Sequence, residues 1–320
     1  DQNVRRAISD DDGGAIVIWY EPSYGNFNIQ AQRIDSNGNL LWNASGVTVI
    51  DVAANGYYFT YPIISDGGNG VIVSWCDDRS GDYDVYAQRV DASGTVLWTP
   101  SYTEVCTEAG DQTGVDIAPD QSGGAIICWT DDRVTDPGIY AQRIDPAGTA
   151  LWAGGGVAVF EEDNLRGIVS DGDGGAIIVW SVFVDIYTDN MIYAQRLSSS
   201  GTKLWDPSGV FIEDGNPESS GIASDAEGGA YIVYGKRGFD SYDDIYAQRI
   251  YHDGYVGKPY VSSVSPQYEQ HGASHSADIT IQFDSDMDET TFDETSIIVY
   301  GNLTGLYSCT YTYDSVEKEL

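Results

Sequence analysis

The sequence predicts an all-β protein, most of which is a five-bladed β-propeller with four-stranded blades. Two observations predict this fold class. A unit of blade length recurs five times along the 320 residues, and no stretch keeps the 3.6-residue apolar period of a long amphipathic helix. Composition agrees, because glycine and tyrosine are abundant, with 37 and 23 residues.

The repeat is marked by the tripeptide Ala-Gln-Arg, which recurs every 53 to 56 residues. Its arginines are Arg33, Arg89, Arg143, Arg196 and Arg249. An aspartate with a glycine four residues after it precedes each tripeptide, at Asp10, Asp66, Asp120, Asp171 and Asp225. An aromatic residue follows nine positions after each aspartate. In four repeats a Leu-Trp pair places a tryptophan nine residues after the arginine, at Trp42, Trp98, Trp152 and Trp205.

Each repeat is predicted to form four antiparallel strands, a to d. Examples are a segment ending at Asp66 for strand a, 175–180 for b, 139–145 for c and 156–159 for d. The a-b turn, Asp-x-x-Gly-Gly, uses glycine for positive φ and aspartate to hold its own backbone. Radial repetition of such sheets is the propeller solution to exposed sheet edges.

The last repeat departs from the pattern, because neither Leu-Trp nor a Gly-Val-x-Val strand follows Arg249. Two alternatives are open: the fifth blade has three strands, or residues upstream of Asp1 supply the fourth. The segments 170–180 and 139–145 resemble the propeller repeats of large secreted bacterial surface proteins, and the likeness covers residues 5 to about 254. This resemblance implies an extracellular location, secreted or attached to a cell surface.

A different pattern begins after the repeats, with alternating segments at 261–266, 279–283 and 296–300 and an acidic turn at 283–288. These residues resemble the immunoglobulin-like modules of bacterial surface-layer and adhesin proteins. We therefore expect a propeller over residues 1–257 and a partial immunoglobulin-like β-sandwich over 258–320. Because such a sandwich needs about 100 residues, it is expected to be incomplete at its C-terminus, with further modules of the same polypeptide as partners.

The charge of the chain restricts its partners. Fifty acidic against fifteen basic side chains give a net charge of −35, which repels phosphate backbones and anionic membranes. No run reaches the roughly 18 apolar residues of a membrane span. We expect no nucleic-acid partner and no membrane insertion, and a glycan or a surface protein as the partner. The four cysteines show no metal-site or disulfide spacing and are expected to be buried thiols.

Residues shared by all repeats are expected to be architectural, because each meets the same environment in every blade. The recurring arginines are expected to pair between blades with carbonyls or carboxylates such as those of Asp78 or Asp132. No cofactor is expected. Calcium at Asp171 and Asp173 is the weaker alternative, since a lone Asp-x-Asp lacks the six or more oxygens that calcium takes.

The connections that vary in length predict a ligand face. The b-c segment runs 14 to 16 residues and the d-a segment 19 to 24, and both loops leave the same end of an up-and-down blade. Aromatic residues in or near these loops break the repeat and are predicted to bind a glycan or peptide, the alternative being that they pack inward. They are Tyr24, Phe27, Tyr57, Tyr58, Phe59, Tyr61, Phe183, Tyr187, Phe239 and Tyr242.

We therefore expect a non-enzymatic surface scaffold for adhesion or for glycan or protein binding, with no catalytic residues. One alternative is a polysaccharide-degrading enzyme resembling five-bladed glycosidases, which use two carboxylates in the central funnel. Its candidate carboxylates are Asp77, Asp116, Glu161, Asp163 and Asp185. A second alternative is a structural spacer without a ligand.

Overall fold

A computed structural model of the chain describes most of the repeat region and four short strands beyond it. The described residues are 3–23, 26–52, 61–98, 102–161, 164–183, 190–237, 243–256, 261–265, 280–283, 299–301 and 305–307. All their regular structure is strand, in agreement with the predicted all-β class. Residue contacts divide the chain into two compact units, Asp1–Val256 and Gly257–Leu320. We call the first unit the repeat region.

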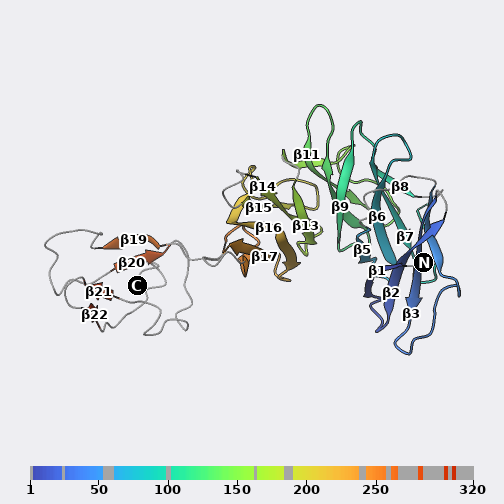
Figure 1. Cartoon of the computed structure of the whole chain (residues 1–320), viewed down its shortest axis with the longest axis horizontal. Helices are drawn as coiled ribbons and strands as arrows, with labels where there is room; N and C mark the ends of the chain where they lie inside the picture. Colours follow the sequence, from blue (N-terminus) through green and yellow to red (C-terminus); the bar gives the residue numbers. More distant parts are fainter. Residues whose placement is uncertain are drawn as a thin grey trace. The chain divides into compact units, whose positions relative to one another are not determined.

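The first three repeats each form a four-stranded sheet, and the sheets follow one another in chain order (Figure 1). Repeat 1 contains β1 (Asn3–Ser9), β2 (Ala15–Ser23), β3 (Asn26–Ile34) and β4 (Val47–Val52). Repeat 2 contains β5 (Ile63–Ser65), β6 (Val71–Asp77), β7 (Asp84–Val90) and β8 (Thr103–Cys106). Repeat 3 contains β9 (Gln112–Pro119), β10 (Ala125–Asp131), β11 (Gly138–Ile144) and β12 (Val157–Phe160).

Repeats 4 and 5 share one six-stranded sheet, because a single long strand serves both. Repeat 4 contains β13 (Leu165–Ser170), β14 (Ala176–Val182), β15 (Asn190–Leu197) and the start of β16 (Val210–Ser224). Repeat 5 contains the rest of β16, then β17 (Ala230–Arg237) and β18 (Asp243–Ile250). Among the described residues repeat 5 has these three strands, and β18 is the edge of the sheet.

Every neighbouring pair in these sheets is antiparallel, so each repeat runs up and down as predicted. The first strands of successive repeats contact one another, from β1 through β5, β9 and β13 to β16. In repeats 1 to 3 the fourth strand lies at the opposite edge of its sheet. Sheets placed side by side around their first strands have the arrangement of propeller blades.

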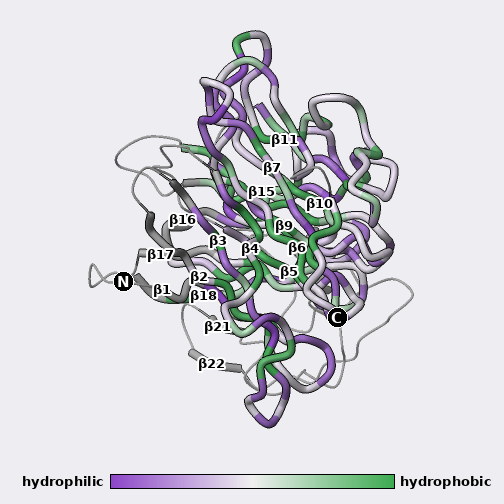
Figure 2. Tube along the Cα trace, turned by 90° about the vertical axis from the view of Figure 1, so that its right-hand side faces the viewer, coloured by the Kyte–Doolittle hydropathy of each residue, from purple (hydrophilic) through white to green (hydrophobic). Residues whose placement is uncertain are grey.

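The hydrophobic core lies between successive sheets rather than within one of them. Four clusters of buried side chains each join one repeat to the next. The second strands are therefore covered on both faces, and all seven residues of β6 are buried. This explains why these strands read as continuous apolar runs. Figure 2 shows hydrophobic residues along the strands and hydrophilic residues mainly at the turns.

The turn aspartate and the Ala-Gln-Arg arginine of one repeat bind each other in all five repeats. The aspartate Oδ1 accepts the backbone N–H of the glycine four residues on, at 2.6 to 2.8 Å. Its Oδ2 accepts the arginine Nε–H at 2.8 to 3.0 Å. The architectural role is therefore confirmed, but the predicted partners Asp78 and Asp132 are wrong. The turn carboxylate is nearer because the a-b turn lies against the end of the third strand, where a Cβ on the turn glycine Gly124 would clash with the Ile144 carbonyl oxygen.

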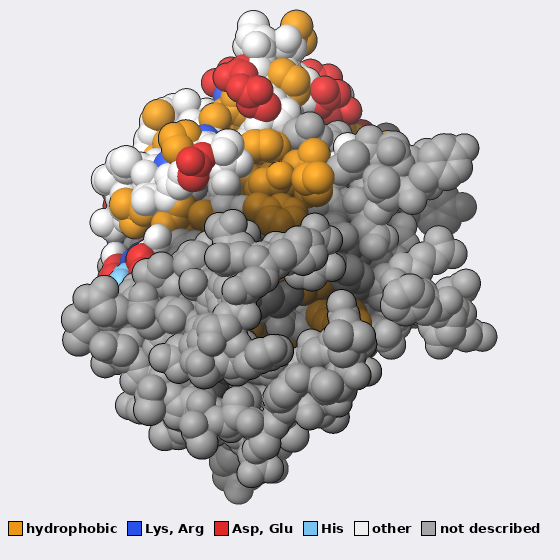
Figure 3. All heavy atoms as spheres, turned by 90° about the vertical axis from the view of Figure 1, so that its left-hand side faces the viewer, with side chains coloured by type: hydrophobic (Ala, Val, Ile, Leu, Met, Phe, Trp, Pro, Cys, Tyr) orange, Lys and Arg blue, Asp and Glu red, His pale blue; other side chains and the backbone are white. Residues whose placement is uncertain are grey.

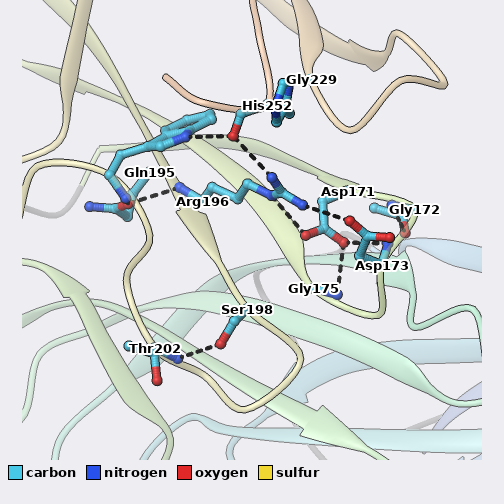
Figure 4. A network of polar contacts seen from close by, with 12 residues as sticks. Asp171, Gly172, Asp173, Gly175, Gln195, Arg196, Ser198, Thr202, Gly229 and His252 are labelled. Atoms are coloured by element: carbon cyan, nitrogen blue, oxygen red, sulfur yellow. Dashed lines mark hydrogen bonds and ion pairs between the residues drawn. The ribbon is translucent and has the colours of Figure 1, made fainter. Parts of the chain in front are cut away.

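The same arginines also reach the next repeat. Arg89, Arg143 and Arg196 each donate from a terminal nitrogen to a backbone carbonyl in the c-d turn of the following repeat, at 2.9 to 3.0 Å. Figure 4 shows Arg196 between the carboxylates of Asp171 and Asp173 and the carbonyl of His252. One guanidinium therefore binds the a-b turn of its own repeat and the c-d turn of the next repeat, which links the two sheets.

The Leu-Trp tryptophans form the second link between repeats. Each indole N–H donates to a carbonyl of the next c-d turn at 3.0 to 3.1 Å. Each ring also lies directly over the positive-φ glycine of that turn, where a Cβ would come within 3.1 Å of the ring. The glutamine of Ala-Gln-Arg accepts the backbone N–H of the tryptophan in its own repeat at 2.9 to 3.0 Å. The tripeptide thus positions the tryptophan that docks on the neighbouring sheet.

Beyond the repeat region the structure describes two antiparallel strand pairs. One joins β19 (Val261–Ser265) to β20 (Thr280–Phe283), and the other joins β21 (Val299–Gly301) to β22 (Gly305–Tyr307). The immunoglobulin-like sandwich stays a prediction.

Removing one turn aspartate should strongly destabilise the repeat region. Asp120→Ala leaves Arg143 largely buried without its carboxylate, at a cost of about 3 to 5 kcal/mol. Asp145→Ala, in the c-d turn of the same repeat, removes backbone hydrogen bonds only and should cost about 1 kcal/mol. Urea denaturation measures both, and equal losses would contradict the role given to the ion pair.

Candidate functional site

One position on the first strands carries a different type of side chain in different repeats. This position lies four residues before the turn aspartate. It is occupied by Arg6, Pro62, Asp116, Gly167 and Gly221. Because the first strands contact one another in series, these residues belong to the inner part of the repeat region. Asp116 is the one carboxylate of the five.

Asp116 lies on β9 and is half-buried. Its Oδ1 accepts the backbone N–H of Ile117 at 2.9 Å. A Cβ placed on Gly167 would lie 3.7 Å from its Oδ2, so the carboxyl faces the neighbouring strand β13. The same Cβ would lie 2.8 Å from Ile222 Cγ2, so glycine at 167 allows Ile222 to pack close to this strand.

The surroundings of Asp116 favour its neutral form. Removal from water raises the pKa of the Asp116 carboxyl above its ordinary value. The backbone N–H groups of Ile117 and Ile168 and the charge of Arg6 act in the opposite direction and are outweighed. A carboxyl that keeps its proton above the usual range can donate it to a bound molecule.

A cavity of about 540 Å³ begins at the residue after Asp116. It lies where the first strands of repeats 3, 4 and 5 enter their a-b turns, at the opposite end from the b-c and d-a loops. Its wall is mainly apolar, with hydroxyl and amide groups among the lining residues. These are Ile117, Ala118, Pro119, Gln121, Ile168, Val169, Ser170, Gly172, Ser224 and Ala226. This volume is in the range of small-molecule sites.

The polar groups of the cavity come from neighbouring repeats. Gln121 Nε2 donates to Ser170 Oγ at 3.1 Å, which links the a-b turn of repeat 3 to the end of β13. Ala118 is two residues beyond Asp116 on β9 and thus on the same face of the strand. An elongated molecule in the cavity could therefore extend along β9 towards the Asp116 carboxyl.

Asp77, one of the candidate funnel carboxylates, has a structural role. It is buried and accepts the Trp75 indole N–H at 2.8 Å and the Arg79 Nε–H at 2.7 Å. The guanidinium of Arg79 lies over the rings of Tyr86 and Tyr102, 4.3 and 4.2 Å from their centroids. Repeat 3 has the same arrangement around Asp131. The assignment of Asp77 to the funnel is therefore wrong.

Among the described residues, the other funnel candidates give no second carboxylate beside Asp116. Glu161 is exposed and follows β12, the strand farthest from β9 in its sheet, so its assignment to the funnel is also wrong. Asp163 and Asp185 lie outside the described residues. Of the five candidates, Asp116 alone is placed by the structure on an inner strand.

Most of the predicted aromatic ligand residues lie outside the described part of the chain. These are Tyr24, Tyr57, Tyr58, Phe59, Tyr187, Phe239 and Tyr242. Phe27 lies on β3, and Phe183 directly follows β14 and is exposed. Tyr61 differs from the expectation, because its ring is buried in the cluster between repeats 1 and 2. It packs inward and does not line an open surface.

The carboxylates considered for calcium bind an arginine instead. Asp171 and Asp173 accept hydrogen bonds from Arg196 at 2.9 and 3.0 Å. No group of three or more His, Cys, Asp or Glu side chains that could hold a metal ion occurs among the described residues. These residues also include no helix long and apolar enough to cross a membrane.

Comparisons with known proteins were made for sequence and for structure. No protein-family model matches the chain, and no curated protein matches it. Among solved structures, an endo-arabinase from Bacteroides thetaiotaomicron VPI-5482 is similar at 13% identity with a TM-score of 0.41, over 78% of this chain and 93% of that one. A thermostable family-43 glycoside hydrolase is 12% identical with a TM-score of 0.40, over 81% and 94% of the two chains. Polysaccharide lyase Uly1 is 12% identical with a TM-score of 0.45, over 89% and 74%.

These findings correct the expected function. These three similar structures are named as an endo-arabinase, a glycoside hydrolase and a polysaccharide lyase, which contradicts the expectation of a non-enzymatic scaffold without catalytic residues. They agree better with its alternative, a polysaccharide-degrading enzyme. Because the identities are 12 to 13%, the likeness concerns the fold alone, and a function has to be argued from this chain's own side chains.

Sequence reasoning found Asp116 but missed Arg6 and the cavity. The comparison of repeats was based on loop length, which drew attention to the b-c and d-a loops. A comparison of residue type at each position would have identified the position of Arg6 and Asp116. The cavity gives no such signal, because its lining residues are ordinary strand and turn residues.

Replacing Asp116 should not destabilise the protein at neutral pH. A raised pKa means that this carboxyl contributes stability below its unfolded-state pKa and loses it as the pH rises through the folded-state value. Asparagine does not ionise, so the Asp116→Asn variant does not lose stability as the pH rises. Its melting temperature should equal or exceed that of the parent at pH 7, and the difference between the two should shrink at acidic pH. A large loss at pH 7 would contradict the assigned environment.

Three cysteines should resist modification in the folded protein. Cys76, Cys106 and Cys128 are free and buried. Burial raises the pKa of the Cys76 and Cys106 thiols to about 12, and that of Cys128 well above its ordinary value. Iodoacetamide at pH 8 should label them only after unfolding, as followed by peptide mass spectrometry. Rapid labelling under native conditions would show that the sheets do not pack as described.

Proposed function

We propose that this protein is a polysaccharide-degrading enzyme in which Asp116 is the catalytic acid. The observation that carries the proposal is a half-buried carboxyl of raised pKa on an inner strand, adjoining a cavity large enough for one or two sugar rings. The class of activity agrees with the names of the similar solved structures, but the assignment of Asp116 depends on this chain alone.

Cleavage of a glycosidic bond requires a proton for the departing oxygen, whether water or elimination completes the reaction. Asp116 can supply that proton because desolvation keeps its carboxyl neutral to a higher pH than that of a solvated aspartate. Arg6 is the nearby positive charge and limits this shift. After the transfer, the same charge stabilises the carboxylate that forms.

The cavity supplies a surface for the sugar. Its apolar wall suits the C–H face of a pyranose or furanose ring, and the Ser170 hydroxyl and Gln121 amide can bind ring hydroxyls. A ring seated against Ala118 would place the next glycosidic oxygen along β9 in the direction of Asp116.

Asp116→Asn should abolish depolymerisation while leaving the fold intact. The assay measures new reducing ends, and the ultraviolet absorbance of unsaturated products, on a panel of neutral and acidic polysaccharides. The rate should fall by about 10² or more, the usual contribution of a positioned acid. In the parent enzyme the rate should also fall as the pH rises through the pKa of Asp116.

Asp132→Asn is the matched control, since this exposed aspartate lies in the b-c loop of the same repeat. It should retain the parent rate. The proposal fails if no polysaccharide on the panel is cleaved, or if the Asp116 variant is as active as the control.

Two finer points belong to the same proposal. We place the enzyme outside the cell, in accordance with the secreted surface proteins that its repeats resemble. We also assign residues 258–320 to an immunoglobulin-like module that connects the repeat region to other modules. The alternating segments of that region support the assignment.

A further inference from the structure

The four contacts between successive repeats are built in the same way. One sheet contributes a forward face, made of alternate residues of its second strand and the start of its third strand. The next sheet contributes a rear face, made of the intervening residues of its second strand. In the contact between repeats 3 and 4, Ile126, Cys128 and Ile139 form the forward face, and Ile178 and Trp180 belong to the rear face.

The forward face of repeat 5 is uncovered. Its residues at the positions of Ile126, Cys128 and Ile139 are Tyr231, Val233 and Ile245, which are 44, 37 and 78% exposed. At the same positions in the other four repeats no side chain is more than 1% exposed. Figure 3 shows hydrophobic side chains gathered at the surface of the described part of the molecule.

The rear face of repeat 1 is also incompletely covered. Ala15, Val17 and Trp19 are each partly exposed, whereas their counterparts in repeats 2 to 5 are at most 2% exposed. No described cluster of buried side chains joins repeat 5 to repeat 1. The repeat region therefore ends in two complementary apolar faces.

A tryptophan contact is missing at the same place. The c-d turn glycines of repeats 2 to 5 are Gly94, Gly148, Gly201 and Gly254, and each is covered by the Leu-Trp tryptophan of the preceding repeat. Gly38 is their counterpart in repeat 1, and a Cβ placed on it would meet nothing within 4 Å. Repeat 5 cannot fill this position, because the residue nine after Arg249 is Lys258.

We propose that these two faces bind one further repeat unit of the same kind, a four-stranded sheet with a Leu-Trp pair ahead of its fourth strand. Its rear face would cover Tyr231, Val233 and Ile245. Its forward face would cover Ala15, Val17 and Trp19, and its tryptophan would stack on Gly38. The four contacts already present support this occupant, because in each of them the sheet that contributes the forward face also places its tryptophan on the next c-d turn.

Two other occupants fit less well. Closure of the five repeats on themselves would leave Gly38 without a tryptophan. A second copy of the chain would do the same, because all four of its Leu-Trp tryptophans already cover glycines of their own chain. A unit with a free Leu-Trp pair is the occupant that supplies every element of the contact.

The experiment compares the chain with a version extended by one unit. A copy of residues 112–162 fused ahead of Asp1 keeps the four-residue connection found between β12 and β13. Ile245→Asp is introduced into both chains, and Ile139→Asp into the original chain as the matched control. Thermal unfolding is measured for all of them, with the mass of each species in solution from light scattering.

The proposal predicts that Ile245→Asp changes the midpoint of the original monomeric chain by about 2 °C or less, whereas Ile139→Asp lowers it by roughly 5 °C or more. In the extended chain Ile245→Asp should also lower the midpoint by roughly 5 °C or more. Replacing the tryptophan of the added unit by alanine should lower it as well.

Other results would overturn the proposal. A large loss from Ile245→Asp in a monomeric original chain would mean that the five repeats close on themselves. The same loss together with dissociation of a dimer would identify a second copy as the occupant. If Ile245→Asp leaves the unfolding midpoint of the extended chain unchanged, or if that chain does not fold, the added unit does not occupy these faces.

Discussion

The ion pair between the turn aspartate and the Ala-Gln-Arg arginine is the interaction on which the rest of the structure depends. Each pair is largely buried, and the aspartate also holds the backbone of its turn, so the loss of either partner leaves an uncompensated charge. In three repeats the arginine also binds a carbonyl of the next sheet. Turn geometry and sheet-to-sheet docking are thereby coupled through one side chain.

This coupling distinguishes the turn aspartates Asp10 and Asp225 from Asp116. Burial acts to raise the pKa of Asp10, but the Arg33 hydrogen bond, two backbone donors and the Arg33 charge outweigh it and leave that pKa below its ordinary value. Asp225 is lowered in the same way, against the effect of burial, by backbone donors and Arg249. Such carboxylates stabilise the protein above their unfolded pKa and lose this effect as the pH falls. Asp116 also has two backbone donors, but no arginine hydrogen bond is among the causes of its shift, and burial dominates its pKa.

The sequence predicts the scaffold well because its signals are local. Glycine four residues after aspartate, a tryptophan nine residues after arginine and apolar second strands all follow from turn chemistry and from burial on both faces. The partner of the arginine could not be predicted, because register brings Asp120 to Arg143 from 23 residues away. The inward packing of Tyr61 was missed for a similar reason. The sequence places Tyr61 in the loop before β5, where an exposed ring is expected. The contact between repeats 1 and 2 buries it instead.

The function was the weaker prediction because length variation was taken as the sign of a binding site. The described cavity lies instead among the a-b turns, whose lengths hardly vary, and Asp116, which adjoins the lining residue Ile117, is marked by a change of residue type. Repeats conceal such a site, since one altered position in a shared strand is a small signal beside variable loops. The sequence also gives no sign of the uncovered faces at the two ends, because Tyr231, Val233 and Ile245 are as apolar as the residues at these positions in the other repeats.

The most direct test of this account is a carbon-13 NMR titration of the aspartate carboxyl groups in the folded protein. The account predicts that Asp116 titrates above the ordinary aspartate value of 3.8, while Asp10 and Asp225 titrate below it. Addition of a cleavable oligosaccharide to the Asp116→Asn variant should leave the turn aspartates unchanged. An Asp116 pKa at or below the ordinary value would contradict the distinction between scaffold and site on which the proposed function depends.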